Sequence, residues 1–384
     1  MKSNKKKIIV TTGTRAEYGV LKPLLEQIKK NPKFQLYLIV AGMHLSKKFG
    51  YSVNEIIHDG FTISGRVKMV PLGNSGYEMS VALSEGIKQF SNIFRKVKPD
   101  INVILGDRDE AFAAALAAMH MNIVNVHIAG GDISKGGIDE YIRHAITKIS
   151  NVHFVSTQKS YANVIKMGED KKYVFQTGSP TIDGIPKKFP SKNDILKKYG
   201  LRDGYLLIIQ HPVTTEVSES GDQMKTTLEA VVKTGRDAIV IGPNSDAGHQ
   251  EILQTIKKYV KKYGFIKFHV NLPRDEYLSL LKYCDLIMGN SSSGIIDAPI
   301  FKKAAINIGI RQEGRESAGY IVNTTHNTNS ILRAVKYVSS PQFKHKLKKS
   351  KNVYGDGNAS YRIVRILENL KITPELLQKK ITYK

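Results

Sequence analysis

Short runs of β-branched and other apolar residues alternate along the whole chain with longer stretches whose apolar residues recur at helical spacing. This alternation is typical of βα units arranged around parallel sheets, so it predicts an α/β fold. In the first half, strands are expected at residues 7–12, 35–41, 101–106, 123–127, 152–157 and 173–176. Helices are expected between them at residues 18–30, 77–98, 109–120, 139–151 and 158–167. The first half is therefore predicted to be a doubly wound domain.

The same alternation resumes in the second half after an interruption at residues 178–200. There, three prolines and several lysines break the periodicity, which predicts a linker. Strands are then expected at residues 205–210, 238–242, 266–269, 286–289 and 304–308, with helices such as 224–233 and 250–263. Two open parallel sheets in series place a ligand cleft between them, at the carboxyl ends of the strands.

Length, charge and cysteine content narrow the class of protein. The 384 residues exceed what one hydrophobic core usually supports, which favours two domains. Lys and Arg number 58 against 34 Asp and Glu, and the resulting charge of +24 attracts anions, whether nucleic acid, acidic lipid or phosphorylated small molecules. Cys284 is the only cysteine, so no intramolecular disulfide can form and a cytoplasmic location is expected. No uncharged apolar run reaches the roughly 18 residues that a membrane-spanning helix needs.

Two strand ends in the first half deliver charged residues. The first predicted strand runs into a glycine turn that carries Arg15, and such a turn at a helix start can bind an anion or can be an ordinary cap. The strand at 101–105 delivers Asp107 and Arg108 at its tip, which we predict to face the cleft. Asp109 and Glu110 are expected instead to complement the dipole of the next helix.

The densest group of ionisable residues lies between residues 130 and 151. Asp139 and Arg143, and likewise Glu140 and His144, are four residues apart, so each pair can meet on one face of a helix. A glycine-rich loop that contains Asp132 leads into this helix. The pattern fits either a salt-bridged surface helix or a wall of the cleft, and we favour the cleft wall.

The second half repeats this logic. His211 follows an apolar strand directly, where an imidazole can donate to a phosphate or act as an acid or base. Ser291 and Ser292 follow another strand at an expected helix start and suit a diphosphate, with Asp297 placed in the first turns. Arg311 comes from the loop after the last predicted strand.

These motifs occur in the order TGTRAEYG, GDR, HIAGGD, IDE, RHAITK, QHPVTT, GNSS, IRQEGRE and YGDGNA. Together they resemble the hydrolysing UDP-N-acetylglucosamine 2-epimerases over nearly the whole chain. The resemblance implies a GT-B-like fold of two Rossmann-type domains with an interdomain cleft, at residues 1–183 and 196–356. It also implies that residues 357–384 carry a helix, at about 361–370, that crosses back toward the first domain.

The resemblance implies that UDP-N-acetylglucosamine and water give N-acetylmannosamine and UDP, the first step of sialic acid synthesis, with no redox cofactor and no obligatory metal. It implies a small-molecule UDP-sugar partner and a homodimer or homotetramer. The implied UDP-binding residues are Arg15, Arg108, His211, Asn244, Ser291, Ser292 and Arg311, with Asp297 near the ribose. The implied acid/base residues are Asp107, Asp132, Asp139 and Glu140, and His211 is a further candidate.

The chemistry explains why such a site needs several acids. The hydrogen on C2 of the sugar can leave only together with UDP, and a proton must return from the other face, so both faces need an acid or base. At least one carboxyl should have a pKa raised toward neutrality by burial or by like charges. Ala129 stands where members of the family that this chain resembles often have an acid or histidine, so either Asp107 or Asp132 serves instead or the substrate differs.

Three other functions stay open at this point. The same reaction could use another UDP-sugar, such as UDP-N,N'-diacetylbacillosamine of the legionaminic acid route. A GT-B glycosyltransferase shares the fold and differs by needing an acceptor. A nucleic-acid binder is favoured by the net charge alone, because the chain has no recognised nucleic-acid-binding motif, so no nucleic acid and no membrane partner are expected.

Overall fold

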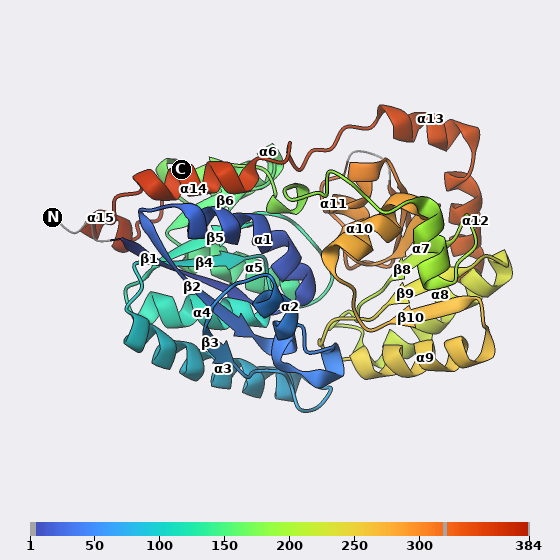
Figure 1. Cartoon of the computed structure of the whole chain (residues 1–384), viewed down its shortest axis with the longest axis horizontal. Helices are drawn as coiled ribbons and strands as arrows, with labels where there is room; N and C mark the ends of the chain where they lie inside the picture. Colours follow the sequence, from blue (N-terminus) through green and yellow to red (C-terminus); the bar gives the residue numbers. More distant parts are fainter. Residues whose placement is uncertain (1–4, 318–320, 383–384) are drawn as a thin grey trace.

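The computed structural model describes residues 5–317 and 321–382 and contains two parallel β-sheets side by side (Figure 1). The first sheet has seven strands in the order β3-β2-β1-β4-β5-β6-β7. Its strands are β1 (Lys6–Thr12), β2 (Phe34–Ala41), β3 (Ile63–Val67), β4 (Ile101–Leu105), β5 (Val124–Ile128), β6 (Val152–Val155) and β7 (Val174–Gln176). The strand order reverses between β1 and β4, which is the doubly wound arrangement.

The second sheet has six strands in the order β10-β9-β8-β11-β12-β13. Its strands are β8 (Leu206–Ile209), β9 (Ala238–Ile241), β10 (Ile266–His269), β11 (Leu286–Gly289), β12 (Ala304–Ile308) and β13 (Ile321–Thr324). All pairings between the described strands of both sheets are parallel. The predicted fold class, two doubly wound α/β domains, is confirmed.

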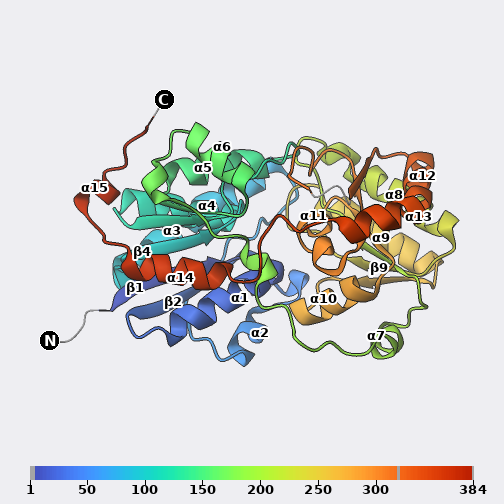
Figure 2. The same cartoon turned by 90° about the horizontal axis from the view of Figure 1, so that it is seen from above.

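Helices cover both faces of each sheet (Figures 1 and 2). Those that follow strands of the first sheet are α1 (Arg15–Lys30), α2 (Val53–His58), α3 (Gly76–Val97), α4 (Asp109–His120), α5 (Asp139–Ile149) and α6 (Gln158–Lys166). Those around the second sheet are α7 (Lys192–Tyr199), α8 (Ser220–Thr234), α9 (His249–Lys262), α10 (Arg274–Tyr283), α11 (Ser293–Ile296), α12 (Thr328–Val338) and α13 (Pro341–Lys349). Two more, α14 (Ala359–Asn369) and α15 (Pro374–Leu377), follow the last of these.

The sequence analysis missed the two edge strands β3 and β13 and several helices, among them α2, α7, α12 and α13. β3 contains Gly65 and Arg66 and is only partly buried, so it lacks the apolar run of a central strand. β13 is a four-residue edge strand without a buried face. The predicted linker at 178–200 is wrong over α7, because Ser191 and Asp194 form a reciprocal capping box that starts a helix, and Gly200 ends it with a φ of 59°.

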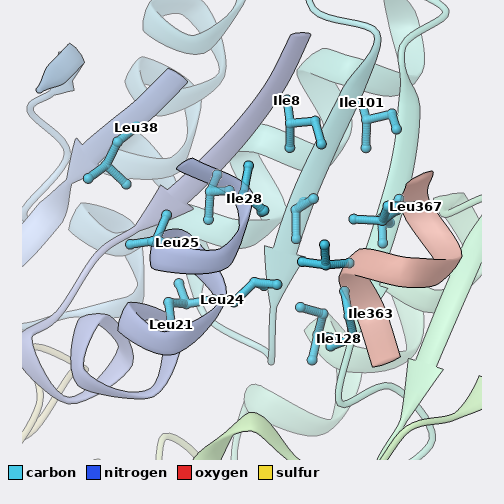
Figure 3. Packing of buried hydrophobic residues seen from close by; sticks show 14 of the residues in the cluster. Ile8, Leu21, Leu24, Leu25, Ile28, Leu38, Ile101, Ile128, Ile363 and Leu367 are labelled. Atoms are coloured by element: carbon cyan, nitrogen blue, oxygen red, sulfur yellow. The ribbon is translucent and has the colours of Figure 1, made fainter. Parts of the chain in front are cut away.

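The core of the first sheet includes α14, which lies beside α1 although the two helices are far apart in sequence (Figure 2). Ile363, Val364 and Leu367 of α14 are in one buried cluster with Leu21 and Leu24 of α1 (Figure 3). The chain therefore crosses from the first sheet to the second and then returns. The outer ends of the expected domains, residues 1–4 and 383–384, lie outside the described residues.

The two crossing segments are tied to each other. The backbone of Gly178 lies against that of Gly355, where an added Cβ would sit 3.3 Å from the Gly355 Cα, and both residues have positive φ. The Ser179 N–H donates to the Tyr354 carbonyl at 2.7 Å. Asp183 accepts hydrogen bonds from the backbone N–H groups of Ala359, at 3.0 Å, and Ser360, at 2.5 Å. The carboxylate of the first crossing thus caps the helix that follows the second.

Asp183→Ala should lower the free energy of unfolding by about 2 kcal/mol, because it leaves two buried N–H groups at the start of α14 without an acceptor. Urea unfolding at equilibrium measures this loss. Asp183→Asn keeps an acceptor oxygen and should recover at least half of it. Equal midpoints for Asp183→Ala and the parent would show that this cap does not stabilise the crossing.

Candidate active site

A cavity of about 340 Å³ lies between the carboxyl ends of the two sheets. Residues just after β1, β4 and β5 line it from one side, and residues just after β8, β9 and β11 line it from the other. Of the predicted site residues, those that line the cavity are Arg15, Asp107, Arg108, Asp132, Asp139, His211, Asn244, Ser291, Ser292, Asp297 and Arg311. Glu140 is the one predicted residue that does not.

Arg143 organises the acids on the first-sheet side. Its side chain is 1% exposed and is hydrogen-bonded to Asp107 and, at 2.7 Å, to Glu140. It also donates to the Ser134 hydroxyl at 3.0 Å and the Asp132 carbonyl at 3.3 Å. A guanidinium has five donors in a planar fork, so a single buried Arg143 sets the positions of three segments around the cavity. Glu140 therefore acts on the site through Arg143 and not by facing the cavity.

Only one of the two helical pairs predicted for α5 forms. His144 Nε2 lies 2.9 Å from Glu140 Oε1, as expected from their spacing. The predicted contact between Asp139 and Arg143 is not made, because Asp139 is hydrogen-bonded to Arg311 across the cavity. A helical spacing permits a contact, but a partner from another element replaces it here.

The carboxyls of the site differ in protonation. Burial raises the pKa of Asp139 to about 6, and the nearby Asp107 adds to this, although Arg311 opposes it. Burial also acts on Asp107, but the charges of Arg143 and Arg315 outweigh it and hold the pKa of Asp107 below its usual value. Of these two acids, Asp139 therefore has the raised pKa, while Asp107 is ionised.

Arg108 spans the two sides of the cavity. Its Nε pairs with Glu110 at 3.1 Å, and its terminal nitrogens reach Ser245, at 3.2 Å, and Asp246, at 3.7 Å, from the second sheet. Burial and the charge of Glu110 raise the pKa of Asp109 to about 7. Asp109 and Glu110 begin α4 as predicted, but Glu110 is also the partner of Arg108. Arg108 thus already has acceptors on both sides of the cleft.

His211 faces the cavity as a neutral donor. Its Nδ1 accepts a hydrogen bond from the Asn244 backbone N–H at 3.1 Å, so the proton of the neutral ring is on Nε2. Burial, with Arg311 and Arg108 nearby, holds the pKa of His211 well below its usual value. Asn290 fixes the loop, accepting from the His211 N–H at 2.7 Å and donating to its carbonyl at 2.8 Å. His211 can therefore donate to an anion without carrying a charge.

Ser291 and Ser292 precede a helix, as predicted, but α11 is a single turn of four residues. It ends at Ile296, just before Asp297. Asp297 is 4% exposed and accepts from the Tyr277 hydroxyl at 2.8 Å and from Arg274 at 3.4 Å. Its carboxylate is thus held by α10.

Several residues that line the cavity were not proposed as site residues from the sequence, among them Glu17, Arg274 and Tyr277. Glu17 lies on α1 within the TGTRAEYG motif, and burial raises its pKa to about 8, although the Gly13 N–H donates to it at 2.6 Å. Arg274 and Tyr277 lie on α10, which carries none of the motifs, and only the fold brings this helix to the strand ends.

Arg15 is held by residues from both sides of the cavity. Its Nε lies 2.6 Å from Glu55, and it is also hydrogen-bonded to Asn271 of the second sheet's loops. Arg315 pairs with Asp132 at 3.1 Å, again across the cavity. Within residues 5–317 and 321–382, no group of three or more His, Cys, Asp or Glu side chains is placed to hold a metal ion. No helix in that part of the chain is long and apolar enough to cross a membrane.

A pair of parallel α/β domains whose strand ends meet at a cavity of arginines, carboxylates and a neutral histidine defines a two-domain enzyme class that handles anionic substrates. The chain belongs to the UDP-N-acetylglucosamine 2-epimerase family, whose model matches residues 26–368. The resemblance found in the sequence is thereby confirmed.

Relatives of known name support this assignment. The chain is 36% identical over 379 residues to a UDP-N,N'-diacetylbacillosamine 2-epimerase (hydrolyzing) of Legionella pneumophila, covering 97% of this chain and 98% of the relative. It is 34% identical over 342 residues to a UDP-N-acetylglucosamine 2-epimerase of Neisseria meningitidis, covering 87% and 88%. The fold is similar to that of the UDP-GlcNAc 2-epimerase crystal structure from Neisseria meningitidis, with a TM-score of 0.81, 18% identity, and 94% and 99% coverage.

Asp139→Asn should remove part of the pH dependence of stability. With a pKa of about 6 in the folded chain and about 4 in the unfolded chain, Asp139 keeps an extra proton when folded. The free energy of unfolding therefore falls as the pH rises from about 4 to about 6, by about 3 kcal/mol at most. Urea unfolding across this range should show a smaller fall in Asp139→Asn. The exposed Asp275→Asn should behave as the parent, and an unchanged fall in Asp139→Asn would contradict the buried carboxyl as its cause.

Proposed function

We propose that this chain is a hydrolysing 2-epimerase that converts UDP-N-acetylglucosamine and water to N-acetylmannosamine and UDP. The observation that carries the proposal is that one cavity holds two kinds of groups, each from a different sheet. Acids of unequal pKa, Asp107 and Asp139, come from the first sheet. Donors for a pyrophosphate, among them His211 and Arg311, come from the second. This supports a reaction in which UDP leaves while a proton is moved on the sugar.

The ionised Asp107 is suited to remove the proton from C2, because Arg143 holds it as a carboxylate. Asp139, with a pKa of about 6, is suited to hold the proton that is later returned to C2. The two groups come from different elements, the β4 end and the α5 start, as action on two faces of a ring requires. Elimination would give a 2-acetamidoglucal, and water would then add at C1 as C2 is protonated from the other face.

The leaving UDP gains negative charge on its β-phosphate. Arg311 can meet it with a bidentate fork, and the Nε2–H of His211 and the serine turn at Ser291 can add hydrogen bonds. A role for Asp297 at the ribose is part of the proposal, since Asp297 lines the cavity on the side of the second sheet. Arg108 is proposed to help through the field of its charge, since Glu110, Ser245 and Asp246 already accept its hydrogen bonds.

A second candidate substrate is UDP-N,N'-diacetylbacillosamine. The relative that is 36% identical over 97% of the chain bears that name, and its reaction would use the same acids and the same pyrophosphate donors. The two substrates differ at C4 and C6 of the sugar, away from C1 and C2.

Our proposal also places the chain in the cytoplasm, as a homodimer or homotetramer on a sialic acid route.

Asp107→Asn should lower turnover by about 10² to 10⁴-fold and leave UDP affinity unchanged, because Asp107 serves the sugar and not the nucleotide. The asparagine oxygen can still accept from Arg143, so the fold should persist. Steady-state kinetics and UDP titration measure the two effects, with Asp203→Asn on the surface as the matched control. Arg311→Ala should instead weaken both UDP affinity and turnover. Equal turnover in Asp107→Asn and the parent would remove Asp107 from the mechanism.

Turnover in deuterated water identifies reaction and substrate together. Each UDP-sugar should release UDP without any acceptor, and NMR should find deuterium at C2 of the released sugar if elimination and readdition occur. N-acetylmannosamine from UDP-N-acetylglucosamine supports the lead proposal, whereas product from UDP-N,N'-diacetylbacillosamine alone supports the second. UDP release that requires an acceptor would favour a glycosyltransferase and contradict both.

A further inference from the structure

The segment at residues 374–382 packs against the far end of the helix that carries the acids. Leu376, 2% exposed, belongs to the core of the first sheet, and its carbonyl accepts from Asn151 just after α5 at 2.9 Å. The Thr382 N–H donates to the Gly168 carbonyl after α6 at 2.9 Å. The segment therefore runs along the ends of α5 and α6, and Figure 2 shows the chain continuing from α15 toward its C-terminus.

Lys379 projects from this segment onto the last turn of α5. Its Nζ donates to the carbonyls of Thr147, at 3.2 Å, Lys148, at 2.6 Å, and Ser150, at 2.7 Å. The last carbonyls of a helix have no partner within it, and they give that end a partial negative charge. An ammonium group has three donors and a positive charge, so Lys379 both hydrogen-bonds to these carbonyls and offsets their partial negative charge. It is a side-chain cap supplied from more than 200 residues away in sequence.

The cap is itself anchored by a buried carboxylate. Glu169, 2% exposed, lies 2.6 Å from Lys379 and also pairs with Lys148, at 2.8 Å, and His153, at 3.0 Å. Burial opposes ionisation of Glu169, but these partners lower its pKa to about 2. Attraction between charges is stronger in such buried surroundings than at the surface. Glu169 therefore binds both Lys379 and Lys148 of α5, and so connects the cap to the end of the helix.

Apolar contacts also hold α5 in place. Ile142 and Ile146 pack on Ile104 of β4 and on Ala111 and Ala115 of α4. Phe112 and Ile149 also pack against this cluster, and together these contacts hold α5 against β4 and α4. The hydrogen bonds from Lys379 to the Thr147, Lys148 and Ser150 carbonyls, and from Asn125 to the Ile149 carbonyl at 3.2 Å, act along the axis of the helix.

α5 has 11 residues and spans about 16 Å, so its two ends move together as a rigid rod. Asp139, Glu140 and Arg143 lie in its first turns beside the cavity. We propose that Lys379 is a positioning residue, which sets the axial position of α5 and through it the acids at the opposite end. The inference rests on the proposed function, since it assigns Lys379 a part in the same reaction.

The test compares Lys379→Met, which keeps the length of the side chain and removes its charge, with Lys380→Met, its exposed neighbour. In Lys379→Met, kcat should fall by about 10- to 100-fold, because small displacements of reacting groups have effects of that size. UDP affinity and KM should change little, since the proposed nucleotide donors lie on the second sheet. Lys379→Arg keeps the donors and the charge and should recover most of the activity. A kcat in Lys379→Met equal to that of Lys380→Met, even with a lower melting temperature, would overturn the inference.

Backbone hydrogen exchange provides a readout that does not depend on activity. Faster exchange at residues 139–143 in Lys379→Met, and not in Lys380→Met, supports transmission along α5. Faster exchange confined to residues 146–150 would overturn it. If the parent releases UDP from neither UDP-sugar, the proposed function fails, while the exchange measurement still decides the role of Lys379.

Discussion

A buried guanidinium has to be paired with acceptors, and in this chain that requirement builds the acid side of the cavity. Arg143 is 1% exposed and holds Asp107 after β4, Glu140 on its own helix, and the Asp132 and Ser134 loop. Removing one partner would leave a buried charge uncompensated, which is far more costly than losing a surface ion pair. Arg143 therefore connects Asp107 to Glu140 and to the Asp132 loop and, together with Arg315, keeps Asp107 ionised.

Ion pairs also join the two halves of the molecule. Asp139 meets Arg311, Asp132 meets Arg315, and Arg108 meets Asp246, and each pair links one sheet to the other. The two segments that cross between the sheets also contact each other, through the backbones of Gly178 and Gly355 and through the hydrogen bonds that Asp183 accepts. Ion pairs therefore connect the acids of the first sheet to the arginines of the second, and Asp246 of the second to Arg108 of the first.

The sequence predicted the α/β class, the strand ends that line the cavity and most of the charged residues there. These succeeded because a parallel strand has an apolar run followed by a polar turn, and both are local patterns. β3 and β13 were missed because partly buried edge strands lack that run. The pair between Asp139 and Arg143 was predicted wrongly, since helical spacing cannot show that Arg311 would arrive from another domain. Arg274 and Tyr277 lie in no motif, and Glu17 lies in the TGTRAEYG motif but was not proposed as a site residue.

By itself, the sequence determined which residues end each strand, because burial periodicity and turn chemistry act over a few positions, and it determined the family through motifs that keep their order. Only the tertiary structure decided which carboxyl is ionised and which has a raised pKa, because those depend on burial and on charges from distant segments. It also decided that His211 is a neutral donor, through one N–H of Asn244, and that Lys379 reaches the end of α5. Such contacts join residues far apart in the chain, and no local pattern encodes them.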